Sequence, residues 1–251
     1  MIRHRPHWRF AAFLVRVQWI DRRATSSFLI GITLQTGVLT LALTRLATDA
    51  RHALDLACRA ALLTGVGIVL LSAMSSVANE FRYGTMENVL LGRMPFARLL
   101  AFRALACAVV VTPAVVVPFA GAVAAFPSLT GTRTVLVVAM VYVCLATLGY
   151  HSTLLLSQFT RPSAAVPWLR LALLLVGLSV LPFPGAQSIA LVLPPAWVLR
   201  YATEAGEPGL PGTPLLFVAV TGCWHCLVWL LLRHRMDARI ERALTDGRAA
   251  W

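Results

Sequence analysis

The sequence predicts an all-helical integral membrane protein with six transmembrane helices. Of its 251 residues 59% are hydrophobic and only 13% are charged, and the mean hydropathy is +0.77, which is unlike a soluble globular domain. The apolar residues gather in runs close to the roughly 20 residues that a helix needs to cross a bilayer. Residues 1–251 therefore fit one membrane domain with few large loops.

The net charge of +12 results from 22 basic and 10 acidic residues. All 22 basic residues are arginines, because the chain contains no lysine. These arginines flank the apolar runs, a pattern that indicates membrane orientation and argues against nucleic-acid binding. A Walker A loop and a pyridoxal enzyme both need a lysine. We therefore expect no cofactor in this chain, and any ATP and Mg²⁺ would be bound by a partner subunit.

The first part of the chain alternates between amphipathic, apolar and charged segments. Tryptophan and arginine lie on different sides of a helical repeat over residues 8–23, which predicts an amphipathic helix in the cytoplasmic interface. The first span is expected at about 27–46 and the second at about 60–78, separated by an external polar stretch, 49–59. A charged cytoplasmic segment, 79–103, follows.

The third span is expected at about 104–126, with kinks at Pro113 and Pro118 that neighbouring helices can tolerate. A short link leads to the fourth span, about 134–157, and the polar loop 158–167 comes next.

A fifth apolar run, 168–181, is short for a full crossing. The next one, 188–198, is too short to span and is interrupted by Pro194 and Pro195. Polar backbone at membrane depth must be buried against protein. The pattern therefore predicts an external re-entrant or interfacial hairpin region over residues 182–213.

The last span is expected at about 214–232, followed by an arginine-rich helical tail, 233–251. On this layout 17 arginines lie on the side of both termini and 5 on the other side. The positive-inside rule then makes both termini cytoplasmic and the stretches 49–59 and 204–214 external.

The charged segment between the second and third spans carries the most informative motif. Gly84 offers a turn, Thr85 can cap a short helix, and Glu87 falls in its first turn, where the helix dipole favours negative charge. The motif residues lie together in one short stretch that is expected to be cytoplasmic. They are Glu80, Arg82, Gly84, Thr85, Glu87, Leu90 and Pro95.

This motif resembles the signature of ABC-2 type transporter permeases, the membrane subunits of ATP-binding cassette exporters, and the predicted layout is similar to that family over nearly the whole chain. The resemblance implies a coupling helix within 79–103 that sits in a groove of the ATP-binding subunit, with Glu80 and Glu87 near its basic surface. At Phe81-Arg82-Tyr83 the family more often has a denser run of charge.

The resemblance also implies two copies of an ATPase subunit, a second permease subunit, identical or related, and a bacterial plasma membrane location. The short external segments leave no folded domain to capture a soluble ligand. We therefore expect export of a hydrophobic or amphiphilic drug, antibiotic or lipid-like molecule. Candidate residues along its path are Trp197, Tyr201 and His151.

Two alternatives stay open, a secondary transporter and an intramembrane enzyme. No Asp or Glu falls within a predicted span, which counts against an ion-coupled transporter. His151 and His225 lie within spans, where hydrogen bonding to a neighbouring helix is the simplest interpretation, but no carboxylate lies near them in sequence to build a catalytic site. Cys223 and Cys226 have CxxC spacing without a second ligand pair, so we assign them to helix packing and expect no metal site.

Overall fold

The computed structural model describes residues 34, 37–38, 40–42, 45–83, 101–102, 105–106, 108–156, 166–180, 191–203 and 212–245. The regular structure of this part is helical, which agrees with the predicted fold class. Its elements are α3 (Ala50–Tyr83), α6 (Thr112–Ala125), the 3₁₀ turn η1 (Pro127–Leu129), α7 (Thr132–Leu156), α8 (Val166–Val180), α10 (Pro194–Thr203) and α11 (Gly212–Thr245). The predicted helix 8–23 and most of the first span lie outside the described residues.

Four helices in the described part are long and apolar enough to cross a membrane. Their apolar windows are Ala50–Ala73, Ala108–Ala125, Thr132–Leu155 and Thr213–Leu232. These windows match the predicted second, third, fourth and sixth spans. Within the described residues the fifth run forms α8, which has 15 residues and is about 22 Å long.

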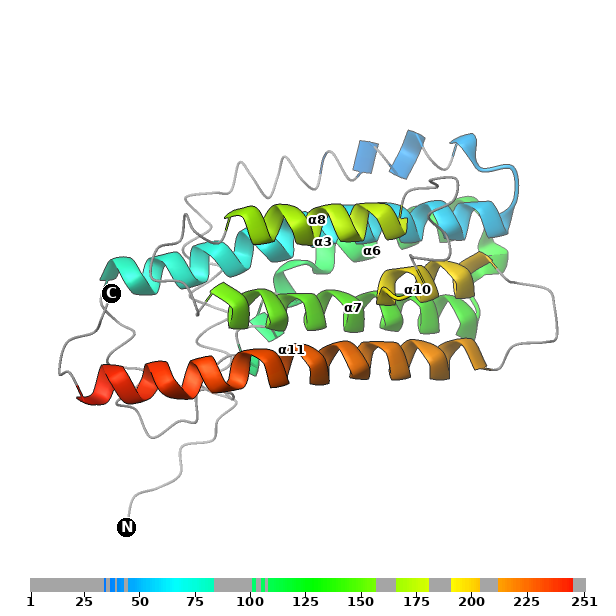
Figure 1. Cartoon of the computed structure of the whole chain (residues 1–251). Helices are drawn as coiled ribbons and strands as arrows, with labels where there is room; N and C mark the ends of the chain where they lie inside the picture. Colours follow the sequence, from blue (N-terminus) through cyan, green and yellow to red (C-terminus); the bar gives the residue numbers. More distant parts are fainter. Residues whose placement is uncertain are drawn as a thin grey trace, which may run out of the picture.

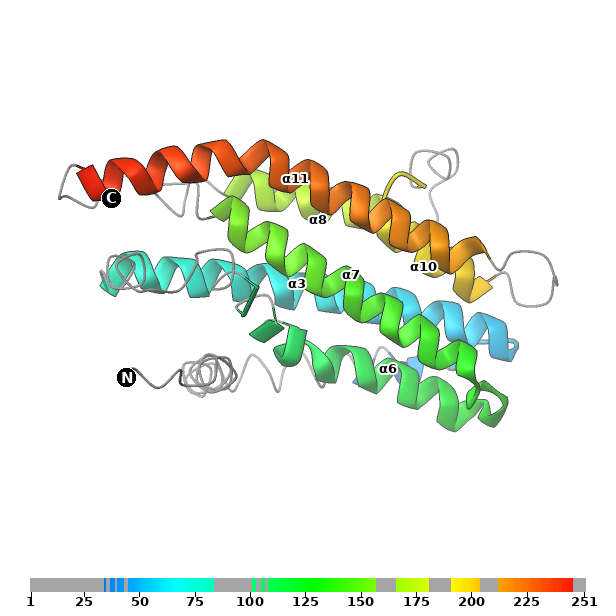
Figure 2. The ribbon, with the colours of Figure 1, turned by 90° about the horizontal axis from the view of Figure 1, so that it is seen from below.

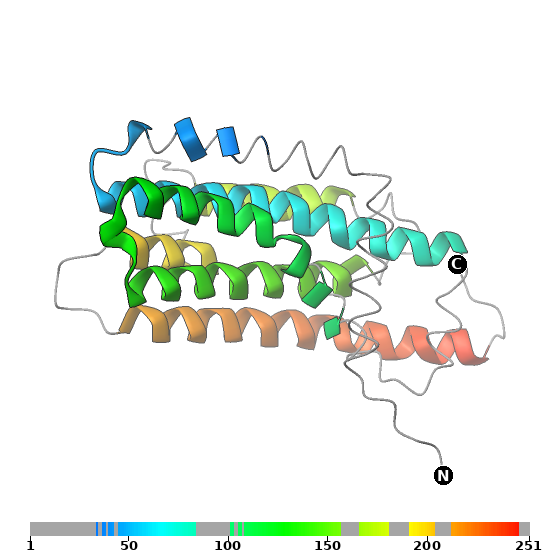
Figure 3. The ribbon, with the colours of Figure 1, turned by 180° about the vertical axis from the view of Figure 1, so that it is seen from behind.

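The helices form one bundle in which α3, α6, α7, α8 and α11 run side by side, and the shorter α10 lies at one end (Figures 1 and 2). The N-terminal ends of α3, α7 and α11 gather at the end that holds α10, and we call this the α10 end. At the opposite end α3 and α11 extend beyond the other helices (Figure 3).

The helix α3 is the centre of the bundle, because 67% of its apolar window is buried against 11% for α11. It begins earlier than the sequence predicts. Asp49 caps its N-terminus: its Oδ1 accepts a hydrogen bond of 2.7 Å from the His52 amide, and its carbonyl accepts the first helical bond, from Ala53. The stretch 49–59, which was expected to be a polar segment between two spans, is therefore the capped first part of α3. The Asp49 cap satisfies a backbone amide at the start of this helix, and composition alone does not reveal such a cap.

Proline shapes α6 and also begins α10. A turn at Val111 separates α6 from the helical residues before it, Pro113 lies in the first turn of α6, and Pro118 lies inside the helix. Both prolines expected within the third span therefore lie in α6. Pro194 and Pro195, which were expected to interrupt an apolar run, instead occupy the first positions of α10, where a missing amide hydrogen costs nothing.

The last helix continues without interruption from the membrane window into the predicted tail, up to Thr245. The predicted helical tail is thus, as far as Thr245, a direct continuation of the last span. Similarly, α3 continues past Ala73 to Tyr83, so the beginning of the predicted segment 79–103 is an extension of the second span.

Close packing of α3 against α7 depends on Gly65. A Cβ atom at this position would lie 2.6 Å from Leu145 Cδ1 and 3.3 Å from Val111 Cγ2. Leu145 and Val111 are themselves buried. Absence of a side chain at Gly65 therefore lets α3 approach α7 and α6 closely, as small residues do in membrane helix pairs.

Candidate functional site

The helix α10 packs among four neighbours, α3, α7, α8 and α11. It is too short to cross a bilayer, yet one side of it is buried in the end of the bundle. Its buried residues are Pro195, Ala196, Val198, Leu199 and Ala202. This arrangement confirms that the segment packs against protein, as irregular or short elements at membrane depth must. Residues 181–190 and 204–211 of the predicted region lie outside the described part.

Arg133 on α7 holds the C-terminal end of α10. Its Nη2 donates hydrogen bonds of 2.6 and 3.1 Å to the carbonyl oxygens of Tyr201 and Ala202, and its guanidinium lies 5.6 Å from the centre of the Tyr201 ring. The last carbonyls of a helix lack intrahelical partners and carry its negative dipole end. Arg133 supplies both the donors and the complementary charge.

Two indole groups hold the turn that precedes α10. The Nε1 of Trp197, within α10, donates to the Leu191 carbonyl, and that of Trp224, on α11, donates to the Val192 carbonyl, each at 2.7 Å. The Arg200 guanidinium lies 5.5 Å from the Trp197 ring. The segment from Leu191 to Thr203 is therefore fixed by side chains of α7, α11 and α10 itself.

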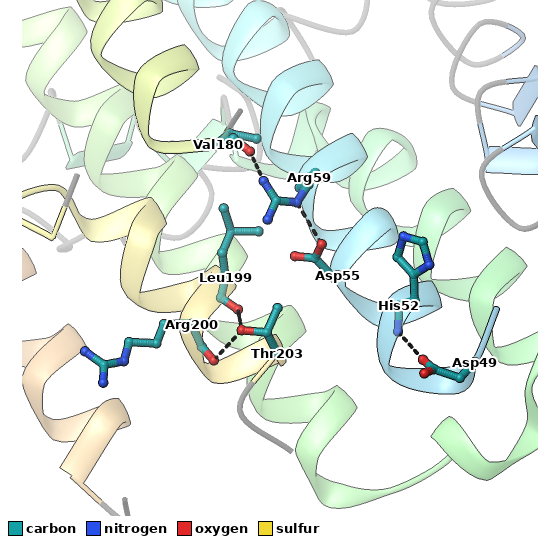
Figure 4. A network of polar contacts seen from close by, with 8 residues as sticks. All are labelled: Asp49, His52, Asp55, Arg59, Val180, Leu199, Arg200 and Thr203. Atoms are coloured by element: carbon teal, nitrogen blue, oxygen red, sulfur yellow. Dashed lines mark hydrogen bonds and ion pairs between the residues drawn. The ribbon is translucent and has the colours of Figure 1, made fainter. Parts of the chain in front are cut away.

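An ion pair on α3 lies beside this segment (Figure 4). Arg59 Nε is 2.8 Å from Asp55 Oδ2, and Arg59 Nη1 also donates to the carbonyl of Val180, the last residue of α8. Asp55 is only 14% exposed, and its Oδ1 is buried without a hydrogen-bond partner in the described structure.

This ion pair corrects one expectation. Asp55 and Arg59 fall within the Ala50–Ala73 window, so the prediction that no carboxylate lies in a spanning helix is wrong. The error followed from starting the second span at residue 60. An ionisable residue inside a membrane helix marks a functional site unless it is structural, and here Arg59 has a structural role because it caps α8.

A second polar contact joins α7 and α11 away from α10. His151 Nε2 lies 3.3 Å from His225 Nδ1, and the Tyr150 ring is 5.1 Å from the His225 ring between centres. The prediction that these histidines bond to a neighbouring helix is thus confirmed. Sequence reasoning could not pair them, because 74 positions separate them along the chain.

The four cysteines that the structure describes divide into two groups. Cys58 and Cys144 are buried, whereas Cys223 and Cys226 are exposed on α11. Helix packing within one chain therefore does not account for the CxxC pair, contrary to the expectation. In the described residues no group of three or more His, Cys, Asp or Glu side chains gathers where it could hold a metal ion.

The predicted sites are brought together only in part. Trp197 and Tyr201 are half-buried beside the core at the α10 end, while His151 lies further along α7, so the three do not form one cluster. Glu80 and Arg82 lie in the last turn of α3 that is described. The remaining coupling residues, Gly84, Thr85, Glu87, Leu90 and Pro95, lie outside the described residues.

No protein-family profile matches the chain, and no curated protein sequence is significantly similar to it. The class must therefore be taken from the fold and the site. Four candidate membrane helices and a buried short helix at one end of the bundle indicate a multi-pass membrane protein.

Proposed function

We propose that the chain is the membrane subunit of an ATP-driven exporter of the ABC-2 type. One observation carries the proposal: α3 and α11 continue past their apolar windows, from Ala73 to Tyr83 and from Leu232 to Thr245, at the same end of the bundle. The α3 extension carries Glu80 and Arg82, the first residues of the motif. Two helices that leave the membrane together provide a platform for a partner.

The partners follow from this assignment. Two ATP-binding subunits, with their ATP and Mg²⁺, would dock on the platform, and a second permease subunit would complete the path. The chain has no lysine to serve a Walker A loop, which supports a separate ATPase. We further propose the full layout of six spans, with α8 and α10 together forming the fifth span and its re-entrant segment.

The orientation proposal places the α10 end outside the cell. The five arginines assigned to that side are Arg45, Arg51, Arg59, Arg133 and Arg200. Of these Arg59 and Arg133 donate to carbonyls of α8 and α10, and Arg200 lies against Trp197. The packing roles of these three arginines explain why they occur on the side that carries fewer arginines. The bias of 17 arginines to 5 remains the guide to topology.

A labelling experiment checks this orientation. In a variant without the native cysteines, Ser128→Cys in the exposed η1 turn should react with a membrane-impermeant maleimide in intact cells, because η1 lies at the α10 end. Ala249→Cys, in the predicted cytoplasmic tail, is the matched control and should react only in inverted vesicles. The reverse pattern at both positions would overturn the topology.

The substrate proposal rests on the same end of the bundle. Aromatic and arginine side chains of α10 lie beside an apolar core there, which suits an amphiphile that enters from the membrane or the cytoplasmic side. We therefore propose export of a hydrophobic drug, antibiotic or lipid-like molecule along a path that includes Trp197, Tyr201 and His151.

Reversal of one motif charge tests the exporter assignment. Glu87→Arg should weaken binding of the ATPase subunit about 10- to 100-fold, because a docking charge then faces a like-charged surface and a few kcal/mol are lost. The measurement is copurification with the proposed ATP-binding subunit, together with ATPase activity in proteoliposomes. Glu207→Arg, the same reversal in the predicted external loop, should leave docking unchanged.

Normal docking and ATPase stimulation by the Glu87→Arg complex would refute the coupling role. In the same proteoliposomes, stimulation of ATPase activity by amphiphiles and not by hydrophilic sugars supports the substrate class, and stimulation by sugars alone refutes it.

A secondary transporter is the second candidate, and Asp55 inside the α3 window is the observation that favours it. The two functions differ in their energy source. Transport driven by an imposed proton gradient without any ATPase would select this alternative.

A further inference from the structure

The helix α11 presents an exposed face that nothing in the described part of the chain covers. Its main contacts are with α7 and α10, and only 11% of its apolar window is buried, against 39–67% for the other three windows. Thr213, Phe217 and Thr221 are the buried residues of this window, and their helical spacing marks the side that faces the bundle. The opposite side carries four exposed residues that we call the α11 seam: Leu215, Ala219, Gly222 and Cys226.

Polar side chains lie at the middle of this exposed face. The window Thr213–Leu232 has 20 residues, so its middle lies just before Cys223. Cys223, His225 and Cys226 are exposed and lie within about 5 Å of that middle along the helix axis. The contact with His151 involves only the Nδ1 atom of His225. Ionisable side chains at membrane depth face protein or a water-filled cavity, and free cysteines are among the most buried residues. Protein, and not lipid, is therefore the expected cover.

The other predicted spans of this chain have their places elsewhere in the bundle. The described residues of the first span lie against α6, where a Cβ atom at Gly121 would collide with Thr40. They are on the opposite side of the bundle from α11 (Figures 1 and 3). The fifth run, α8, packs against α3 and α10. We therefore expect the cover of α11 to come from outside the chain.

We propose that this cover is a second copy of the chain, with α11 of one subunit packed along α11 of the other. The proposal rests on the exporter assignment for its two permease subunits, and it adds that they are identical and where they meet. The residues of the α11 seam follow one another at intervals of four, three and four, as in a helix–helix contact. Two copies inserted with the same orientation place equivalent residues together at the two-fold axis. The polar middle of each helix is then covered by that of the other.

The composition of the α11 seam suits two identical helices. Ala219, Gly222 and Cys226 are small, and small residues let membrane helices approach each other closely. Packing within the described chain does not require a glycine at position 222, because a Cβ atom there meets nothing within 4 Å. The α11 window contains no charged residue, whereas the α3 window carries Asp55 and Arg59. Two copies of α11 can therefore meet without repulsion between like charges.

Disulfide formation by a native cysteine tests the contact. In cells that produce two differently tagged copies of this chain and no proposed partner, a variant that keeps only Cys226 is oxidised with copper phenanthroline. It should form a dimer of twice the 27.2 kDa chain mass that carries both tags. Val116→Cys, in a chain without native cysteines, is the matched control. Val116 is 48% exposed near the middle of the α6 window, and the variant should stay monomeric. Equal yields at the two positions, no dimer through Cys226, or a Cys226 adduct with a different protein would overturn the proposal.

A cysteine scan along α11 tests which face is covered. Single cysteines at Leu215, Ala219 and Gly222 should form dimers as Cys226 does. Cysteines at the exposed positions Leu227 and Leu231 should not, because they lie to the side of the α11 seam and their Cα atoms would exceed the separation of about 7 Å that a disulfide permits. Uniform dimer formation around the helix would indicate random collision and refute the assigned face.

A bulky side chain in the α11 seam provides the second test. Gly222→Leu should abolish the Cys226 dimer and leave the monomer folded in size exclusion, because a side chain there meets no described residue of its own chain. Gly177→Leu on α8, which is equally unobstructed, should keep the dimer. A Gly222→Leu chain that dimerises as well as the Gly177→Leu chain would refute the α11 contact. None of these readouts involves the ATP-binding subunit, so failure here leaves the exporter assignment to be decided by its own copurification test.

Discussion

Replacement of Arg133 with methionine is expected to release the C-terminal end of α10 and to lower the stability of the protein by about 3 kcal/mol. Two carbonyl groups, of Tyr201 and Ala202, lose donors at 2.6 and 3.1 Å, and hydrogen bonds from a charged group contribute about 1.5–3 kcal/mol each. Methionine retains most of the side-chain volume, so the effect isolates the lost charge and donors. Thermal unfolding in nanodiscs should show a midpoint lower by roughly 6–12 °C.

A local probe separates release of α10 from general destabilisation. Ala202 is fully buried, so Ala202→Cys in a cysteine-free background should be labelled slowly when Arg133 is present and much faster with methionine in its place. Arg51→Met is the matched control, because Arg51 is an exposed arginine at the same end. Equal labelling in the two variants would show that Arg133 does not hold α10.

Replacement of Gly65 with leucine is expected to prevent correct packing of α3 against α7. Even a Cβ atom would lie 2.6 Å from Leu145 Cδ1, and a few extra methylene groups in a well-packed core cost about 1–3 kcal/mol. A leucine side chain is larger than these few methylene groups, and it would enter a site lined by the buried side chains of Leu145 and Val111. The expected result is loss of monodisperse protein in detergent, measured by fluorescence-detected size exclusion.

The same helix supplies the control. Gly67→Leu should be tolerated, because a Cβ atom there meets nothing within 4 Å. Gly65→Leu combined with Leu145→Ala should recover part of the monodisperse protein, since the second change creates space at the point of collision. Equal loss for Gly65→Leu and Gly67→Leu would show that close approach at Gly65 is not required.

The structure also explains why charge could be misread as a loop signal. Asp49, Asp55 and Arg59 made residues 49–59 look like an external stretch. In three dimensions Asp49 caps α3, Asp55 pairs with Arg59, and Arg59 caps α8. Polar residues with such partners can belong to a membrane helix, and sequence alone does not reveal the partners.

Much of the fold could be predicted from the sequence because the bilayer imposes one-dimensional rules. A run of about 20 apolar residues must be helical in hydrocarbon, since each backbone group needs a partner within its own segment. The windows Ala108–Ala125, Thr132–Leu155 and Thr213–Leu232 followed from length and hydropathy. Proline positions and the arginine bias likewise required no tertiary information.

The candidate sites depended on contacts between distant parts of the chain, which the sequence does not display. Arg133 meets Tyr201 across 68 positions, Arg59 meets Val180 across 121, and His151 meets His225 across 74. Hydropathy fixes which segments are helical, but helix rotation and neighbours are set by side-chain packing and by the need to satisfy polar groups away from water. Only the tertiary structure could decide that two arginines cap the short helices and that two histidines share one bond.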